Sequence, residues 1–189
     1  MNRKYLQTFQ IKDVVFLAIM SAVALATCAV MPLVISLQPL IFGISQLVTA
    51  LQIGVFFAIG LYKVRKPGSL LIMALMMGLI QLMMSPPMFL SSVLNGVLIE
   101  LIVLLLFRGY EKDAAVFVAA MLHTPLSLPF NYLYNRLIKG ADSPLAAVAD
   151  RAPLAAVGMT LAVVAVSALG ALIGIKIARE LKKSGVLKK

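Results

Sequence analysis

The residues of this sequence that could bind a ligand are neutral polar groups inside apolar stretches. Gln81, Asn95, Asn131 and Tyr132 interrupt runs of leucine, valine, alanine and methionine. Amide and hydroxyl groups in such surroundings suit an uncharged or weakly charged organic molecule, because each partner satisfies the other's hydrogen bonds without burying a charge. We therefore expect these four residues to line a binding site that a small molecule enters from outside the cell.

Two ionisable residues, Glu100 and His123, also lie within apolar stretches. Glu100 follows Phe89 by 11 residues, which places it about 16 Å along a helix, near the middle of a membrane core about 30 Å thick. An ionised carboxylate is costly there unless it is paired. We expect Glu100 to be protonated, or bonded to His123 or Gln81, and to serve either as a structural tie or in ligand binding.

His123 is the only histidine, and it allows two interpretations. It is either a neutral hydrogen-bonding side chain or the axial ligand of a haem-like iron. Pro125 and Pro129 follow on the same stretch and free backbone carbonyls that could line a cavity, so the outer half of this helix is expected to be kinked or unwound. The candidate substrate-binding residues are Gln81, Asn95, Glu100, His123, Asn131 and Tyr132.

The motifs of soluble enzymes are absent from the sequence. It has no glycine-rich phosphate loop with a lysine, and its single cysteine excludes a cysteine pair. We expect a protein that is not an enzyme, has no resident cofactor and has no metal site unless His123 binds haem. Any ATP-driven step then requires a partner protein. Two further interpretations stay open: an intramembrane enzyme that uses Glu100 as acid or base, and a purely structural membrane subunit.

The elements that must position these residues are membrane-spanning helices. Hydrophobic residues make up 62% of the 189 residues and charged residues 13%, whereas soluble domains average about 45–50% and about 25%. The mean hydropathy is +1.03. The sequence therefore predicts an all-α integral membrane protein with six transmembrane helices in a single domain, residues 1–189. The predicted spans are about 14–35, 40–62, 69–85, 88–107, 114–132 and 154–177.

The basic residues predict the orientation of these spans. Of the 17 Lys and Arg residues, 14 fall on the side of both termini. The other 3 are Arg136, Lys139 and Arg151. Because cytoplasmic loops carry the excess of Lys and Arg, we expect both termini in the cytoplasm. The net charge of +10 then reflects membrane topology, and no nucleic-acid partner is expected.

Three alanines in the first span, Ala18, Ala22 and Ala26, recur every four residues. This spacing places them on one face of a helix, where small side chains let another helix approach closely. The stripe either packs inside this protein or docks a further membrane subunit.

Six short spans, the alanine stripe and a length just under 200 residues resemble the substrate-binding S components of energy-coupling factor (ECF) transporters. The segments Arg65-Lys66-Pro67-Gly68 and Asn95-Gly96-Val97-Leu98-Ile99-Glu100, with Phe107-Arg108 after them, look like the YkoE-type branch of that family. That branch is associated with thiamine or its hydroxymethylpyrimidine part. The chain differs from it in having no tryptophan.

The resemblance implies a subunit that captures a micronutrient from outside a prokaryotic plasma membrane. Thiamine or its hydroxymethylpyrimidine precursor is the first expectation for the substrate, and haem or another tetrapyrrole, with His123 as iron ligand, is the alternative. In that family an alanine pattern on the first helix contacts the transmembrane coupling subunit, and two ABC ATPase subunits drive release inward. These subunits, the micronutrient and the lipid bilayer are the expected partners.

Overall fold

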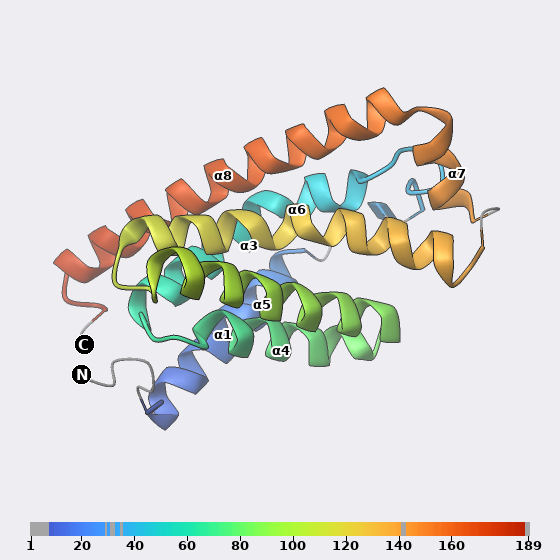
Figure 1. The fold of residues 1–189 in the computed structure, drawn as a ribbon. Coiled ribbons are helices and arrows are strands. Elements are labelled where there is room, and N and C mark those ends of the chain that lie inside the picture. The colour runs from blue at the N-terminus through green and yellow to red at the C-terminus, as the bar shows by residue number, and fades with distance from the viewer. Residues whose placement is uncertain (1–7, 29, 31–32, 35, 141–142, 188–189) are drawn as a thin grey trace.

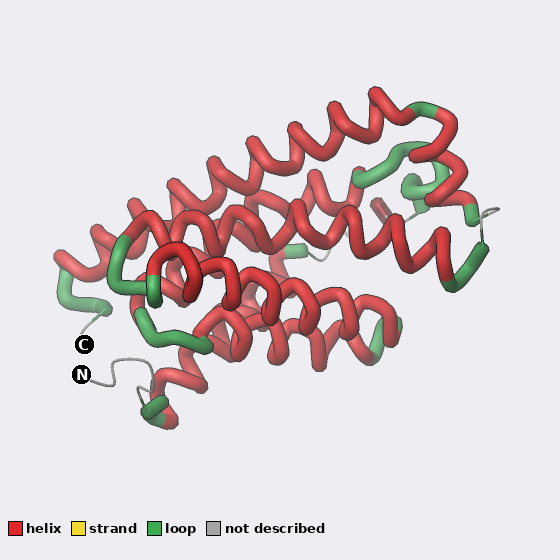
Figure 2. The backbone as a smooth tube through the Cα atoms, in the orientation of Figure 1, coloured by secondary structure: helices red, strands yellow, loops and turns green. Residues whose placement is uncertain are grey.

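The computed structural model describes residues 8–28, 30, 33–34, 36–140 and 143–187. Within those ranges the chain forms one bundle of helices and turns without any strand (Figures 1 and 2), so the all-α prediction is confirmed. Its helices are α1 (Ile11–Thr27), α3 (Ile44–Lys63), α4 (Ser69–Leu82), α5 (Pro86–Phe107), α6 (Asp113–Leu137), α7 (Pro144–Arg151) and α8 (Pro153–Lys183).

Helix α3 lies at the centre of the bundle. It packs most extensively on α8 and also on α6 and α1, while α5 packs between α4 and α6. The α3–α8 contact is close because glycines of α8 face the backbone of α3. A Cβ atom on Gly170 would lie 2.5 Å from the carbonyl oxygen of Leu51, and one on Gly174 would lie 2.4 Å from that of Val55. Small residues at helix contacts are typical of membrane proteins.

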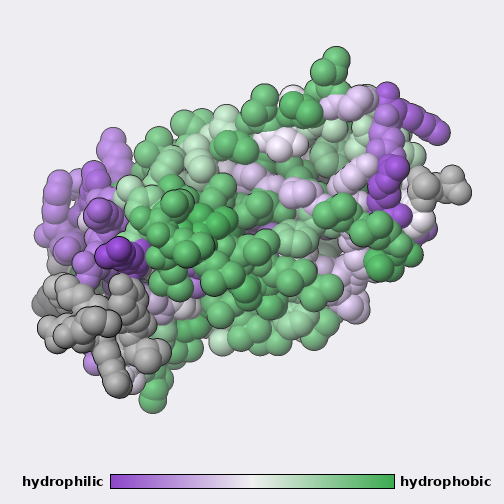
Figure 3. Space-filling view, viewed as in Figure 1, coloured by the Kyte–Doolittle hydropathy of each residue, from purple (hydrophilic) through white to green (hydrophobic). Residues whose placement is uncertain are grey.

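Four of the described helices, α3, α5, α6 and α8, are long and apolar enough to cross a membrane. Helix α4 is apolar but has 14 residues, and α1 has 17. Figure 3 shows hydrophobic side chains over the middle of the molecule and hydrophilic ones at both ends. Leu105 and Leu161 are exposed, as expected for a surface that lipid covers. The count of six spans stays a prediction.

The first helix is shorter than the predicted span. Helix α1 ends at Thr27, whose hydroxyl donates to the carbonyl of Ala24 over 2.8 Å, and Cys28 forms its C-cap. Bonding of this kind between a threonine hydroxyl and the backbone competes with further helix and is common where helices end. The predicted outer limit, Pro32 to Ile35, includes positions outside the described residues.

Helices α6 and α8 are longer than predicted. Helix α6 runs through Pro125 and Pro129 to Leu137. Of the two expectations for its outer half, unwinding is therefore wrong, and a kink stays a prediction. Neighbouring helices in a membrane bundle can compensate for the hydrogen bonds that proline removes. Helix α8 continues to Lys183 and includes part of the basic tail. Pro86 and Pro87 begin α5, because the first turn of a helix has N–H groups without an internal acceptor and tolerates proline.

Helix α7 lies between the predicted spans 114–132 and 154–177, where the sequence predicted no helix. Ser143 is its N-cap and Pro144 its first residue, both typical of a helix start. Ala146 and Ala149 are buried, where α7 packs on α6 and α8.

The two ends of the bundle differ in what they contain. The start of α1, the end of α8, the α3–α4 turn and the α5–α6 turn lie together at the left in Figure 1, and we call this the terminal end. The α4–α5 turn and α7 lie at the right, and we call this the α7 end.

Candidate functional site

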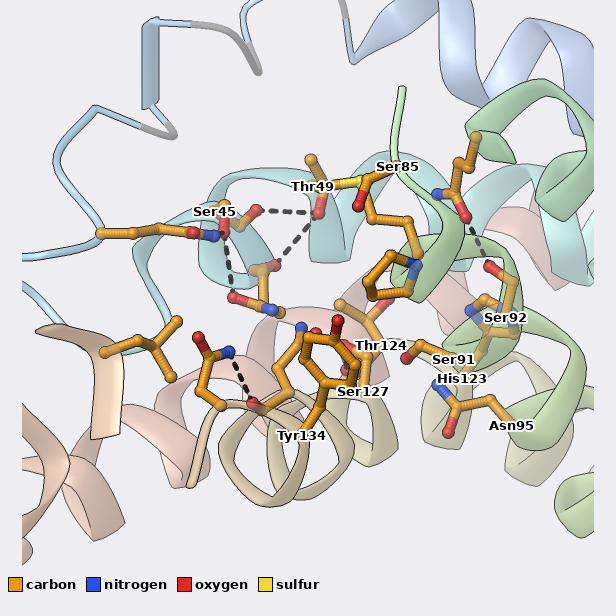
Figure 4. Close-up of a pocket in the computed structure, with 18 of the residues that line it drawn as sticks. Ser45, Thr49, Ser85, Ser91, Ser92, Asn95, His123, Thr124, Ser127 and Tyr134 are labelled. Atoms are coloured by element: carbon orange, nitrogen blue, oxygen red, sulfur yellow. Dashed lines mark hydrogen bonds between the residues drawn. The ribbon is translucent and has the colours of Figure 1, made fainter. Parts of the chain in front are cut away.

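A cavity of about 630 Å³ lies at the α7 end, between α3, α4, α5 and α6. Its volume is within the range of small-molecule sites, about 300–1,000 Å³. Figure 4 shows side chains from α3, α5 and α6 arranged around this space. Its polar lining residues are Gln38, Ser45, Gln46, Thr49, Gln81, Ser85, Ser91, Ser92, Asn95, His123, Thr124, Ser127, Asn131, Tyr134, Asn135, Lys139 and Ser143.

Helices α3, α5 and α6 each supply a stripe of polar side chains to the cavity. Residues three or four apart on a helix share a face, and the lining residues follow that spacing. The sets are Ser45 and Thr49 on α3, Ser91 and Asn95 on α5, and Thr124, Ser127 and Asn131 on α6.

A hydrogen-bond network orders the α3 side of the cavity. Gln38 donates to the hydroxyl of Ser45, which donates to Oε1 of Gln46 over 3.0 Å. The hydroxyl of Thr49 donates to the carbonyl of Ser45 over 2.9 Å. These bonds are drawn in Figure 4. They hold the polar groups of this wall in fixed positions before any ligand arrives.

The inner end of the cavity contains polar atoms for which the described protein supplies no partner. They are Oδ1 of Asn95, Nε2 of His123 and Oγ1 of Thr124. The three residues are 1%, 4% and 3% exposed, respectively, and buried polar atoms are normally hydrogen-bonded. The ring of Phe57 meets His123 edge to face, with centroids 4.4 Å apart, and so fixes the imidazole plane. A ligand could supply the missing hydrogen bonds here.

Four of the six candidate binding residues line this cavity: Gln81, Asn95, His123 and Asn131. Gln81 accepts a hydrogen bond of 2.6 Å from Ser92. Tyr132 does not line it, since successive helix residues point about 100° apart and Asn131 already faces the cavity.

Tyr132 instead belongs to a surface cluster with α7. Its hydroxyl donates to Asp150 over 2.7 Å and accepts from Arg136 over 3.0 Å. Arg136 also forms an ion pair with Asp150. The cluster ties α7 to α6 beside the mouth of the cavity.

Glu100 lies at the terminal end and not in the cavity, so the predicted bond to His123 or Gln81 is wrong. Its carboxylate accepts from the N–H of Gly68 over 2.6 Å and from the hydroxyl of Tyr110 over 2.9 Å. Gly68 is the N-cap of α4, where free N–H groups attract a carboxylate. Burial and the nearby Glu100 raise the pKa of Tyr110 well above its usual value, so Tyr110 remains a donor. Glu100 therefore joins α4, α5 and the following turn.

Ion pairs reinforce the same end of the bundle. Asp113 pairs with Arg65 and, over 2.6 Å, with Arg179. Lys66 pairs with Asp13 over 2.7 Å. These contacts join α1, α6 and α8 to the α3–α4 turn.

The alanine stripe of α1 faces largely outward. Ala18 is half-buried, and Ala22 and Ala26 are exposed. The opposite face packs inside the bundle, where the buried Ser21 donates to the carbonyl of Met73 over 3.1 Å. Packing within this protein therefore leaves Ala22 and Ala26 uncovered.

Sequence reasoning missed the α3 side of the cavity and the hydroxyls of α5 and α6. The signal was present, because Ser45 and Thr49, like Ser91 and Asn95, are separated by four residues within apolar stretches. Among the described residues no group of three or more His, Cys, Asp or Glu side chains could hold a metal. The arrangement is suited to binding through hydrogen bonds.

Comparisons with known proteins agree with this architecture. The sequence profile of a family described as "Hypothetical bacterial integral membrane protein (Trep_Strep)" matches residues 11–183, which confirms the prediction of a multi-pass membrane protein. A solved structure described as "Crystal structure of an S-component of ECF transporter" has the same fold, with a TM-score of 0.64 and 21% identity over 95% of this chain and 89% of that chain. No curated protein matches the sequence.

Proposed function

The chain belongs to the Trep_Strep family of bacterial integral membrane proteins, and we propose that it is the substrate-capturing S component of an ECF-type importer. The observation that carries the proposal is the cavity at the α7 end, with ordered polar walls and three buried polar atoms that lack partners among the described residues. The fold shared with an ECF S component supports the same conclusion.

The site favours capture over chemistry. Its lining is dominated by amides and hydroxyls, which hold a ligand without reacting with it. Glu100, the one carboxylate proposed as an acid or base, is bonded at the opposite end of the bundle. The polar atoms of Gln81, Asn95, His123 and Asn131 are the ligand-binding groups in this proposal.

The proposed substrate is a micronutrient with a small hydrogen-bonding heterocycle, either thiamine or its hydroxymethylpyrimidine precursor, as in the YkoE-type branch. Amides and hydroxyls can bond both donors and acceptors of such a ring. The alternative substrate is a tetrapyrrole with His123 as iron ligand. The many amides and hydroxyls among the lining residues favour the smaller hydrogen-bonding heterocycle over a broad apolar macrocycle.

The proposed orientation places the mouth of the cavity outside the cell and both termini in the cytoplasm. The charge asymmetry of 14 to 3 supports it. So does the shared location of the start of α1 and the end of α8 (Figure 1), which an even number of crossings requires. A nutrient would then enter from outside, and the ATPases would act at the terminal end.

The proposed partners are a transmembrane coupling subunit and two ABC ATPases, with α1 as the docking helix. Ala22 and Ala26 are exposed, so a partner helix could approach the backbone of α1 closely at these positions. Ala18 lies on the same face, nearer the terminal end.

The experiment is affinity purification of the tagged chain from its native membrane, with and without the double substitution Ala22→Leu and Ala26→Leu. We expect the unchanged chain to co-purify with the coupling subunit and both ATPases, and the double variant to lose them because the larger side chains hold the partner helix away. Ala165→Leu is the matched control, since Ala165 is an exposed alanine on α8. It should retain the partners.

Two results would contradict the proposal. Absence of any ATPase from the unchanged preparation would argue against an importer subunit. Equal recovery of the ATPases with the double variant would argue against α1 as the docking helix.

A further inference from the structure

We propose that the cavity selects its ligand by charge and takes an uncharged or anionic hydrogen-bonding molecule in preference to a cation. This inference rests on the proposed capture function and narrows its substrate class. It separates the two candidate nutrients, because hydroxymethylpyrimidine is uncharged whereas thiamine carries the same pyrimidine joined to a cationic thiazolium ring.

The first observation is the absence of acidic side chains from the described lining of the cavity. The only charged side chain among these lining residues is that of Lys139, near the mouth. Asp150, on the neighbouring helix α7, is engaged by Arg136 and Tyr132. A cation that enters would therefore lose water without gaining a carboxylate from the described lining to balance its charge.

The free-energy cost of removing a cation from water determines which ligands the cavity prefers. Burial of a charge is unfavourable unless an opposite charge or several oriented dipoles compensate for it. Lys139 adds repulsion for a cation and attraction for an anion. Neutral ligands incur neither cost and gain hydrogen bonds from the amides and hydroxyls of the walls.

The second observation is the set of buried polar atoms at the inner end that have no hydrogen-bond partner among the described residues. Oδ1 of Asn95 accepts hydrogen bonds, Oγ1 of Thr124 both donates and accepts, and a neutral imidazole nitrogen does one or the other. A ligand edge that presents a donor beside an acceptor matches this set. An aminopyrimidine or a carboxamide has such an edge.

The experiment measures thermal stabilisation of the purified full-length chain by ligands that differ in charge. One series is nicotinamide, nicotinate and 1-methylnicotinamide, which share a ring and are neutral, anionic and cationic, respectively. The second series compares uncharged hydroxymethylpyrimidine with cationic thiamine. Biotin and pantothenate are added as anions. We expect stabilisation by at least one neutral or anionic compound and none by 1-methylnicotinamide, and binding of hydroxymethylpyrimidine at least tenfold tighter than that of thiamine.

Two substitutions test the cause. Asn95→Asp places a carboxylate at the inner end, and Ser91→Asp places one a turn nearer the mouth, at a half-buried position that tolerates charge more easily. In either folded variant we expect the preference to shift at least tenfold toward thiamine. Thr160→Asp, on α8 outside the cavity lining, controls for added negative charge and should leave the preference unchanged.

The outcomes separate this inference from the proposed function. Stabilisation by a cation as strong as that by its neutral counterpart would overturn charge selection and leave capture standing. An unchanged preference in Ser91→Asp would also overturn it. If no compound in the panel stabilised the chain, micronutrient capture itself would fail, and charge selection with it.

Discussion

At the scale of single residues, the cavity contains side chains whose polar atoms are free to bond a ligand because they form no hydrogen bond within the described protein. Thr124 is 3% exposed, yet its hydroxyl has no partner among the described residues. Thr49, on the facing wall, instead donates to its own helix. The hydroxyl of Thr124 is therefore available to bind a ligand, whereas that of Thr49 is bonded within its own helix.

Thr124→Val tests this distinction, because valine keeps the shape of the side chain and removes only the hydroxyl. We expect ligand affinity to fall roughly fivefold, which corresponds to one lost hydrogen bond of about 1 kcal/mol. The melting temperature without ligand should stay the same or rise, since no internal hydrogen bond is lost. Titration calorimetry and thermal melts measure the two effects.

Thr160→Val is the matched control, because the hydroxyl of Thr160 bonds the carbonyl of Ala156 on α8 over 2.8 Å, away from the cavity. It should leave ligand affinity unchanged. A Thr124→Val protein that bound as tightly as the original chain would show that this hydroxyl does not contact the ligand.

Tyr110→Phe tests the structural role of Glu100. The change removes a hydrogen bond of 2.9 Å to a buried carboxylate, so we expect the free energy of unfolding to fall by about 1–3 kcal/mol. Ligand affinity should not change, since Glu100 does not line the cavity. Tyr132→Phe, which removes a surface hydroxyl, should alter stability much less. Weaker ligand binding in Tyr110→Phe would link Glu100 to the site.

The sequence identified polar residues inside spans but could not assign all of them to one site. Asn95 and Glu100 lie five residues apart on α5, and one lines the cavity whereas the other bonds the N-cap of α4. Their different roles depend on the position of Gly68 and Tyr110, which only the packing of helices sets. Likewise, Asn131 and Tyr132 are neighbours that point in different directions.

At the scale of helices, hydropathy located every long element, while its ends depended on local chemistry. Pro125 and Pro129 suggested an interruption, yet α6 continues through both, because the packed bundle overrides the local preference. Helix α7 was missed because its eight residues are too few for a membrane span. Its Ser143-Pro144 start was nevertheless readable from the sequence.

Gly174→Ala tests the close contact of α3 and α8. The added methyl would lie 2.4 Å from the carbonyl oxygen of Val55, so the helices must separate. We expect a loss of about 1–3 kcal/mol in the free energy of unfolding, as for other overpacked interiors. Gly158→Ala, on the same helix with nothing within 4 Å, should be neutral or slightly stabilising. Equal stability of both variants in denaturation experiments would contradict this packing.

At the scale of the whole molecule, the account depends on orientation. The charge asymmetry along the sequence and the common location of the start of α1 and the end of α8 lead to the same arrangement, in which the cavity opens outward. Fusion of a fluorescent protein that matures only in the cytoplasm tests it. We expect fluorescence with fusions at either terminus and none with an insertion at Gly140, near the mouth. A dark C-terminal fusion with normal expression would contradict the six-span arrangement.

The central claim is that this chain captures one small molecule in the cavity at the α7 end. Native mass spectrometry of the chain, released from its membrane in mild detergent, tests it most directly. The account predicts a population with a single bound compound of a few hundred daltons, uncharged or anionic when identified, that is absent from an Asn95→Leu variant of equal stability. A chain that carries no compound, even after incubation with a mixture of micronutrients, would contradict it.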